Sequence, residues 1–555
     1  MLKLAPRWAE KEFQWTSCVD DALATVSNYY GIEYRFSYAK AWDFKYTSYD
    51  TDKNMLFEKR LDTKNALDRY HFLTECHRTK MIYHYTDDVK ELLGIVENEL
   101  SHNRPCAIRM DSYNIPWDYG YQNLHTNHVC MPVAIGKKDI QVIDPYNHMT
   151  DLFFPISRLQ EASGFCITYE VNPQYNEMFD CRSILIQVME EILGITGKGN
   201  DFDNMRQFSR DLKEHFSVEK ELAGNSGRFY WSGFHFRLVE FAFGRSFARQ
   251  ALLYAAERLH SDEIRKIAEA MRRMISKFNY AITIMQRTFK GEMPIEYGLS
   301  DHDKRVLEEV SNIFALEADF EENAANQLLQ CLCGHTEVNK QEAVSNTMLQ
   351  PGPLNLNQTG NACYADLSPY YNNQALGVND LLENADFTGV GEYFLRDDIP
   401  SDRLIKYNGI EFPIGTGHGN LYDNISCRGQ KILICRNNVI QLDFMLTAEW
   451  GSYCEEIQIN YDTGRKGVIP FGVTDFALDP KYGETVVYQG RTLAKSENQV
   501  KPWQEKAKIF AFSVSGINGN IDHLILPVCE RIHIFALRIV QGRTQNLEVH
   551  RAEFC

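Results

Sequence analysis

The hydrophobic pattern of this chain changes sharply near residue 350. Between about residues 178 and 345, apolar residues recur at three- and four-residue steps, as they do along one face of a helix. Residues 341–361 accumulate Asn, Gln, Pro and Gly without periodicity, and short alternating runs follow Tyr364. A hydrophobic pattern with the helical period does not fit a strand, and one with the strand period does not fit a helix. The chain must therefore contain a helical region and a separate all-β region.

The residues before this helical region mix both patterns. The expected elements there are helices over 18–30 and 86–101, a strand over 106–110, an apolar strand that follows His128, and a strand over 140–145. A chain of 555 residues is long enough for several cores. We predict an α+β domain over residues 1–175, an α-helical domain over 176–349 that completes a cleft, and an all-β jelly-roll sandwich over 350–555.

The all-β prediction depends on short alternating runs separated by turn residues. Turns are expected at Tyr461–Gly464 and at Asn518–Gly519. The runs expected to form strands are Ile432–Ile434, Val439–Leu446, Glu456–Ile459, Lys508–Val514, Asp522–Pro527 and Ile532–Val540. Runs of this length and spacing are typical of a sandwich.

Composition narrows the classes of partner. A net charge of −17 at pH 7 disfavours nucleic acid, which is bound by basic surfaces. The fourteen cysteines show no secreted disulfide framework and suit a reducing cytosol. The first residues contain no apolar signal segment, and the sequence contains no run of eighteen apolar residues, the length that would span a membrane. We therefore predict a cytoplasmic protein without nucleic-acid or membrane partners.

Cys18 begins the helix expected at 18–30. Thr16 or Ser17 is a suitable N-cap, and Gly31 is a suitable stop. The first turn of a helix presents unpaired backbone N–H groups and the positive end of the dipole, which together favour a thiolate. Most free cysteines are simply small buried hydrophobes, so Cys18 becomes a candidate nucleophile only in combination with other residues.

Those other residues follow in the order of a cysteine-dependent triad. His128 leads into an apolar strand, and the next strand ends in Asp144-Pro145. A nucleophile on an early helix, a base on a strand and a carboxylate on the next strand are arranged for base-assisted attack by a thiol. The predicted catalytic residues are Cys18, His128 and Asp144, with His125 left open as an alternative base.

These motifs resemble papain-like peptidases that cleave bacteriocin leaders and, more closely, the butirosin biosynthesis protein H family. The resemblance rests on Cys18 followed by "YYG", on "RPCAIRMDSYNIPWDYGYQNLHTNHV" at Arg104–Val129, on "VIDP" at Val142–Pro145 and on "FPISRLQEA" at Phe154–Ala162. It covers residues ~1–290, because the Gly233–Leu253 helix also resembles that family's helical partner. It implies a papain-like fold and acyl transfer from a carrier-protein thioester.

The third domain resembles jelly-roll modules appended to glycoside hydrolases. The motifs are "YADLSPYYNN" (Tyr364–Asn373), "ADFTGVGEYF" (Ala385–Phe394), "NGIEFPI" (Asn408–Ile414) and "DNISCRGQKI" (Asp423–Ile432). The resemblance implies a sandwich and says little about a ligand, because a fold does not carry function.

Several further residues are candidates for supporting roles. Gln14, four residues before Cys18, is a candidate oxyanion donor, as a glutamine is in papain-like enzymes. Asp111 and Tyr113 match the family's "D.Y" and are candidate substrate-binding residues. The run Cys331-Leu-Cys333-Gly-His335 has no second ligand pair at zinc-site spacing, so no metal is predicted.

Arginines recur along the helical region, among them Arg237 and Arg245. The favoured interpretation is a solvated helix face with ion pairs at helical spacing to residues such as Glu240. The alternative is a basic face for a carrier protein or for the phosphate of its pantetheine arm.

The sequence therefore predicts a cysteine-dependent acyltransferase. It would move an acyl or peptidyl group from the phosphopantetheine of a carrier protein, through acyl-Cys18, to an amine-bearing small molecule in non-ribosomal peptide or polyketide biosynthesis. No tightly bound cofactor is expected. Two alternatives stay open: a peptidase or thioesterase that uses the same triad for hydrolysis, and a non-catalytic carbohydrate- or partner-binding protein on a papain-like scaffold.

Overall fold

The computed structural model describes most of the chain in two compact units. The described residues are 2–9, 17–64, 70–86, 88–118, 120–122, 125–159, 164–172, 179–197, 199–222, 229–289, 301–334, 347–356, 360–389, 391–415, 422–495, 500–504 and 506–542. Unit 1 comprises Met1–Phe216, Gly233–Ile275 and Phe314–Thr336, and unit 2 comprises Ser217–Ser232, Ser276–Ile313 and Glu337–Cys555. The helical region expected as a domain of its own is therefore divided between the two units.

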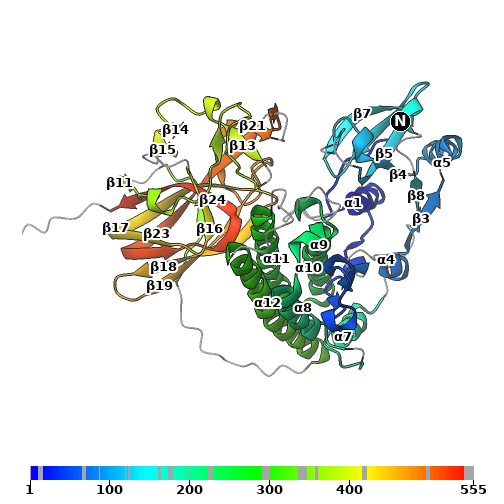
Figure 1. The fold of residues 1–555 in the computed structure, drawn as a ribbon, viewed down its shortest axis with the longest axis horizontal. Helices are drawn as coiled ribbons and strands as arrows, with labels where there is room; N and C mark the ends of the chain where they lie inside the picture. Colours follow the sequence, from blue (N-terminus) through cyan, green and yellow to red (C-terminus); the bar gives the residue numbers. More distant parts are fainter. Residues whose placement is uncertain are drawn as a thin grey trace, which may run out of the picture. The chain divides into compact units, whose positions relative to one another are not determined.

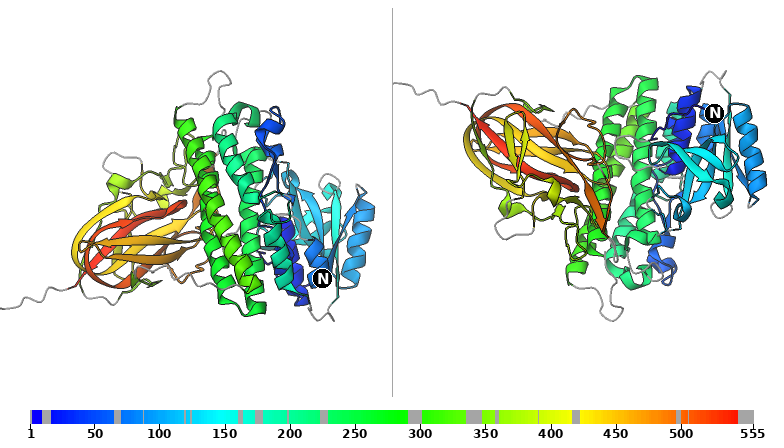
Figure 2. Two further views of the ribbon diagram at one scale, coloured as in Figure 1. Left: turned by 90° about the horizontal axis from the view of Figure 1, so that it is seen from below. Right: turned by 90° about the horizontal axis from the view of Figure 1, so that it is seen from above.

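Unit 1 is built around a six-stranded antiparallel sheet in the order β3-β8-β4-β5-β6-β7 (Figure 1). Its strands are β3 (Thr79–Tyr85), β4 (Cys106–Asp111), β5 (Asn127–Ile135), β6 (Asp139–Asp144), β7 (Met149–Pro155) and β8 (Phe165–Val171). Helices α1 (Cys18–Tyr30) and α5 (Val89–Ser101) lie on opposite faces of this sheet (Figures 1 and 2).

Both faces of the sheet are apolar because each is covered by a helix. Along β5, Val129 and Met131 share a core with Leu23 of α1, whereas Cys130 shares the other core with Val96 of α5. Successive side chains of a strand point to opposite faces. A strand between two helices therefore reads as a continuous apolar run, which is what the sequence after His128 shows.

The ends of α1 match the expected start and stop. Ser17 is the N-cap, and its side chain accepts a hydrogen bond from the Asp20 amide. Gly31 is the C-cap in the left-handed conformation, with φ 67°. These two caps fix the ends of the helix, so the helix begins at Cys18 and this residue lies in its first turn.

The aromatic segment after α1 stacks on α10, and one of its residues hydrogen-bonds to α1. The Tyr38 hydroxyl donates to Asp20 Oδ1 (2.9 Å), and its ring stacks on Phe247 of α10 at 4.2 Å. Phe44 stacks on Phe241 of the same helix at 4.4 Å. The remaining elements assigned at least in part to unit 1 are β1 (Lys45–Tyr46), α2 (Phe57–Arg60), β2 (Leu61–Asp62), α4 (Tyr70–His77), α7 (Cys181–Ile192), α8 (Asp201–His215), α10 (Gly233–Leu259), α11 (Asp262–Thr288) and α12 (Asp301–Cys333).

Unit 2 is a β-rich body with two hydrophobic cores. The main sheet runs β11-β24-β17-β23-β18-β19-β9, with β10, β16 and β20 paired off this path, and a second sheet runs β12-β13-β21-β22. Phe444 and Phe512 are paired across β17 and β23 in one core, whereas their neighbours Met445 and Ala511 belong to the other. The long strands thus carry apolar side chains on both faces.

The elements of unit 2 join several expected runs, because β17 contains both Ile432–Ile434 and Val439–Leu446, and β23 contains Lys508–Val514 together with the run from Asp522, which ends at Ile525. They are α9 (Val218–Leu222), β9 (Thr347–Met348), β10 (Pro351–Pro353), β11 (Asn361–Tyr364), β12 (Leu376–Gly377), β13 (Glu392–Leu395), β14 (Leu404–Tyr407), β15 (Ile410–Pro413), β16 (Ile425–Arg428), β17 (Lys431–Ala448), β18 (Tyr453–Tyr461), β19 (Lys466–Val473), β20 (Thr485–Gly490), β21 (Thr492–Lys495), β22 (Val500–Pro502), β23 (Ala507–Ile525) and β24 (Val528–Gln541). Among the helices of the described residues, none combines the length and apolar character needed to cross a bilayer.

Two expectations about this region are corrected. Asn518–Gly519 is not a turn, because it lies inside the continuous strand β23, where the pairing with β17 shifts register. The described part of the expected linker is not wholly irregular either, since β9 pairs with β19 and β10 pairs with β23. The turn at Tyr461–Gly464 is confirmed between β18 and β19.

A pair of glycine substitutions tests the local argument for α1. Gly31→Ala should destabilise the protein by about 1 kcal/mol, because alanine is strained in the left-handed conformation. Gly94→Ala, in the interior of α5 with open space at the added Cβ, should instead stabilise it by about 0.5–1 kcal/mol. Urea unfolding followed by tryptophan fluorescence measures both. Equal signs for the two variants would contradict the assignment.

Candidate active site

Cys18 lies at the first position of α1 and is half-buried. The two carboxylates that follow it are fully buried and already hydrogen-bonded. Asp20 accepts bonds from the hydroxyls of Ser17 and Tyr38, and Asp21 accepts from the Ala9 amide at 2.7 Å. These bonds tie the first turn of α1 to its surroundings, so the position of the Cys18 thiol is set by several elements of unit 1.

His128 and Asp144 form the base–carboxylate pair expected from the sequence. His128 Nε2 lies 2.8 Å from Asp144 Oδ2, and both residues are buried. Asp144 Oδ2 also accepts from Trp117 Nε1 at 3.0 Å, and the carboxylate accepts two further bonds from the backbone and side chain of Asn147. A carboxylate with four donors is fixed in place, and it fixes the ring of His128 in turn.

The hydrogen bonds of the pair decide its charge. Burial opposes the imidazolium form, but bonds to Asp144, Cys130 and Cys18 outweigh burial and hold the pKa of His128 well above its ordinary value. Burial likewise opposes a charged Asp144, yet the bonds from His128 and Asn147 keep the pKa of that carboxyl below its ordinary value. These bonds favour an imidazolium facing a carboxylate, and the Cys18 sulfur lies in hydrogen-bonding reach of the ring.

A second thiol, Cys130, lies beside the same ring. It follows His128 by two residues in β5, and its thiol hydrogen-bonds to the His128 ring. Burial, reinforced by the charge of Asp144, raises the pKa of Cys130 to about 12, so this residue stays a thiol. Donor atoms of His128, Cys130 and Asp144 lie within 4.8 Å of one another, a spacing that a metal ion could use. Because His128 Nε2 is already engaged with Asp144, we interpret the cluster as a hydrogen-bonded base.

Two residues that the sequence analysis missed also face the His128 ring. Asp118 Oδ2 lies 3.6 Å from His128 Nδ1, and the Tyr146 ring lies 5.8 Å from the imidazole, edge to face. Asp118 lies in the loop between β4 and β5, and Tyr146 follows the Asp144-Pro145 turn. Neither carries a sequence signal, because only the closure of those two loops brings them to His128.

His125 belongs to a separate surface cluster. Its Nδ1 lies 2.8 Å from Asp111 Oδ2, its ring stacks on Tyr113 at 4.2 Å, and its side chain is 70% exposed. The structure thus joins three of the expected auxiliary residues, and it is His128 that contacts Cys18. Gln14 lies outside the described residues.

Arg245 lies neither on a solvated helix face nor on an accessible basic face, so both expectations from the sequence are wrong for this residue. Its side chain is completely buried, with Nη2 2.8 Å from Glu321 Oε2 and Nη1 donating to the Asp43 carbonyl. Arg237 is partly exposed but is paired with Glu240 at 2.8 Å and hydrogen-bonded to Thr63. Arg245 appears in the sequence as one of a surface series, yet it faces inward because α10 is covered on several sides.

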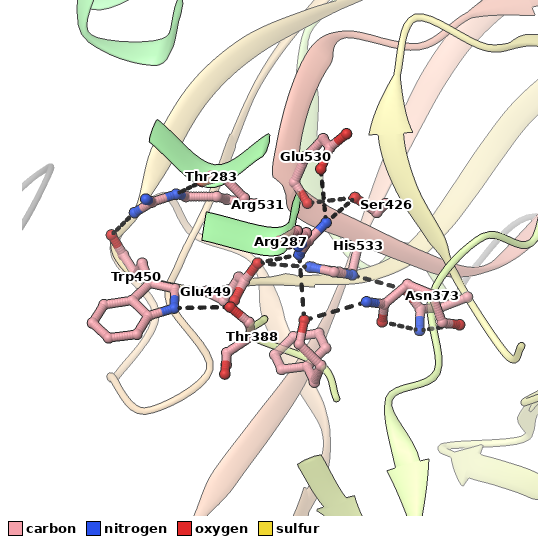
Figure 3. Close-up of polar contacts among 12 residues, drawn as sticks. Thr283, Arg287, Asn373, Thr388, Ser426, Glu449, Trp450, Glu530, Arg531 and His533 are labelled. Carbon is pink, nitrogen blue, oxygen red and sulfur yellow. Dashed lines mark hydrogen bonds and ion pairs between the residues drawn. The ribbon is translucent and has the colours of Figure 1, made fainter. Parts of the chain in front are cut away.

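Unit 2 contains a second buried polar cluster, around Arg287 of α11 (Figure 3). The guanidinium binds Glu449 at 2.6 Å, Glu530 at 2.9 Å and the Ser426 hydroxyl at 3.0 Å. His533 Nε2 lies 3.4 Å from the same Glu449 oxygen, Oε1. Arg428 also pairs with Glu530. Cations among buried acids and hydrogen-bond donors are typical of a structural ion-pair network.

The contacts around this network join distant segments of the unit. Arg531 donates to the Thr283 hydroxyl of α11 and to the Trp450 carbonyl, and Trp450 Nε1 donates to the Thr388 carbonyl (Figure 3). Asn373 donates to the Phe387 carbonyl, which also accepts from Arg287. These bonds hold the α11 segment of unit 2 against its strands.

Burial shifts the ionisation of several groups near Arg287. It raises the pKa of Glu392 to about 8, helped by the charges of Glu449 and Asp475, and raises that of Glu449 itself to about 7 against the pull of Arg287. Burial and the charge of Arg287 lower the pKa of His533 well below its ordinary value. The cluster therefore limits its own charge by holding a proton on buried carboxyls and none on the imidazole.

Comparison with known families bears on unit 2 alone. A family model described as the AziU2-like beta-sandwich domain matches residues 362–543, about a third of the chain, and this agrees with a C-terminal β-sandwich. No curated protein matches the chain. Neither finding supports the resemblance to butirosin biosynthesis protein H, which stays a prediction together with the papain-like fold of the N-terminal region.

Stability should fall as the pH rises from about 5 to about 8. In that range the folded chain holds a proton on Glu392 that the unfolded chain has released, so higher pH favours unfolding, by about 1.4 kcal/mol for each unit of pKa difference. Glu392→Gln should remove part of this slope in thermal unfolding between pH 5 and pH 8. Glu456→Gln, an exposed change on β18, should leave the slope unchanged. A slope equal in all three proteins would contradict the assignment.

Proposed function

We propose that the protein is a cysteine-dependent acyltransferase with a papain-like N-terminal domain. The observation that carries the proposal is the arrangement of Cys18, His128 and Asp144, with the thiol at a helix N-terminus in contact with an imidazole that a buried carboxylate orients. This is the geometry of an activated thiol nucleophile. The resemblance of Arg104–Val129 to acyltransferases favours a thioester as the acyl donor.

Acylation uses the thiolate–imidazolium pair. The Cys18 thiolate attacks the thioester carbonyl of a carrier-bound acyl group, and the carbon–sulfur bond to the pantetheine breaks. His128 gives its proton to the departing pantetheine thiolate, and it becomes neutral while Asp144 keeps the ring oriented. The backbone N–H groups of the first turn of α1 are candidate donors to the developing oxyanion.

The acyl-enzyme is then discharged by an amine acceptor, with neutral His128 taking a proton from the attacking nitrogen. The same intermediate discharged by water defines the alternative, a thioesterase or peptidase. The second alternative, a non-catalytic binding protein, is disfavoured by the activated geometry of Cys18, because a mere scaffold does not need an oriented base. The predicted donor partner is an acyl or peptidyl carrier protein, and no tightly bound cofactor is required by this chemistry.

Acyl trapping tests the proposal. Incubation with an acyl-carrier-protein thioester should add the mass of the acyl group to the intact protein, and Cys18→Ala should abolish this adduct without loss of thermal stability. An added amine should discharge the adduct to an amide faster than water does. Cleavage of ordinary peptides without any retained acyl group would instead support the peptidase alternative.

Alanine substitution of the two histidines distinguishes the base. His128→Ala should reduce the rate of acyl-adduct formation by at least about 100-fold, the low end for a general base. His125→Ala should have a milder effect, because His125 is exposed and paired with Asp111. Both rates are measured by mass spectrometry of the intact protein. The opposite order of effects would assign the base to His125.

A further inference from the structure

Asp118 is a second carboxylate beside the proposed catalytic base, His128. Its Oδ1 accepts the Gly120 amide at 2.7 Å, which fixes the orientation of the group, and its Oδ2 lies 3.6 Å from His128 Nδ1. The side chain is 11% exposed, so it is held in place but not sealed from solvent. Asp118 is therefore a positioned acid whose second oxygen is directed toward the reacting groups.

The other groups that face His128 are already engaged. Asp144 on β6 accepts four hydrogen bonds, and Cys130 on β5 is a buried thiol. Cys18 on α1 is the nucleophile, and Tyr146 presents its ring to the imidazole. Among the described residues, the only cationic group within ion-pair distance of Asp118 Oδ2 is His128.

The position of Asp118 relative to His128 suits a cationic substrate. Because Asp144 occupies Nε2, the nitrogen left to exchange protons with the reactants is Nδ1, and this is the atom that Asp118 approaches. A group bound between Asp118 Oδ2 and the Cys18 sulfur would lie beside that nitrogen. Aliphatic amines are ammonium ions at neutral pH, and a carboxylate is their natural partner.

We propose that Asp118 binds the acceptor of the transfer reaction as an ammonium ion, and so selects an aliphatic amine over water. This inference rests on the proposed acyltransferase function and adds the charge class of the acceptor and the residue that recognises it.

The proton balance of the discharge step is consistent with this role. The bound ammonium loses one proton through Asp118 to solvent, and the freed lone pair attacks the carbonyl carbon of acyl-Cys18. Neutral His128 takes a second proton from the same nitrogen as the carbon–nitrogen bond forms. The carbon–sulfur bond breaks, and Cys18 leaves as the thiolate beside the His128 imidazolium. One acyl-enzyme and one ammonium yield one amide, the resting ion pair and one released proton.

The test compares a charged with an uncharged acceptor. Wild type and Asp118→Asn are acylated with acetyl-pantetheine, and the loss of the adduct is followed by intact mass at pH 7 with n-butylamine, which is protonated, or hydroxylamine, which is not. Asp118→Asn should slow discharge by butylamine about tenfold, the effect expected for one charge-assisted hydrogen bond. It should change discharge by hydroxylamine less than about twofold. Asp118→Glu should restore part of the preference for butylamine, and Asp139→Asn, an exposed change on β6, should match wild type.

Each other outcome overturns the inference. Equal slowing with both nucleophiles would show that Asp118 only positions His128, and no slowing with butylamine would show that it does not bind the acceptor. Failure of the wild type to form the acyl adduct would overturn the proposed function and this inference together. If the wild type is acylated but Asp118→Asn changes discharge by butylamine and by hydroxylamine equally, this inference fails while the proposed function stands.

Discussion

The hydrogen bond between His128 and Asp144 is the interaction on which the candidate site depends. It crosses between neighbouring strands β5 and β6, and both partners are buried. Isolated charges are costly to bury, so such a pair persists only where each partner offsets the other and further bonds satisfy the remaining lone pairs. Trp117 and Asn147 supply those bonds to Asp144. The hydrogen bonds that satisfy the buried carboxylate of Asp144 thus also orient the imidazole toward Cys18.

The Arg287 cluster of unit 2 is governed by the same physics with a different result. There too a buried cation meets buried carboxylates, but their bonds hold a segment of α11 against the strands. Burial raises the pKa values of Glu392 and Glu449 instead of creating a reactive group. The contrast lies in what stands next to the charges: the pair in unit 1 has a half-buried thiol beside it, whereas the Arg287 cluster adjoins further hydrogen-bonding side chains.

The negative charge of the chain bears on both partners that we propose, the carrier protein and the acceptor. The net charge of −17 disfavours the binding of nucleic acid, and it would also repel an acidic carrier protein. The buried position of Arg245 removes one member of the basic face that such docking would use. At the His128 ring, however, the single carboxylate of Asp118 suits the cationic acceptor that we propose.

The sequence by itself determined the features that depend on neighbours along the chain. The apolar spacing, the Ser17 cap and the Gly31 stop define α1, and the order of Cys18, His128 and Asp144 follows from motifs within single elements. The change of hydrophobic pattern near residue 350 likewise predicted the sandwich. The period of two in strands and of 3.6 in helices is a local property of the sequence.

Only the tertiary structure decided which surfaces are covered and which loops meet. Arg245 is buried because other elements surround α10, and Asn518–Gly519 stays in β23 because pairing with β17 continues through a register shift. The helical region divides between two units because contacts, not periodicity, define a core. Asp118, in the loop after β4, lies beside His128 of β5, a contact that no motif around either residue indicates. These outcomes depend on contacts between residues far apart in the chain, and no local pattern encodes such contacts.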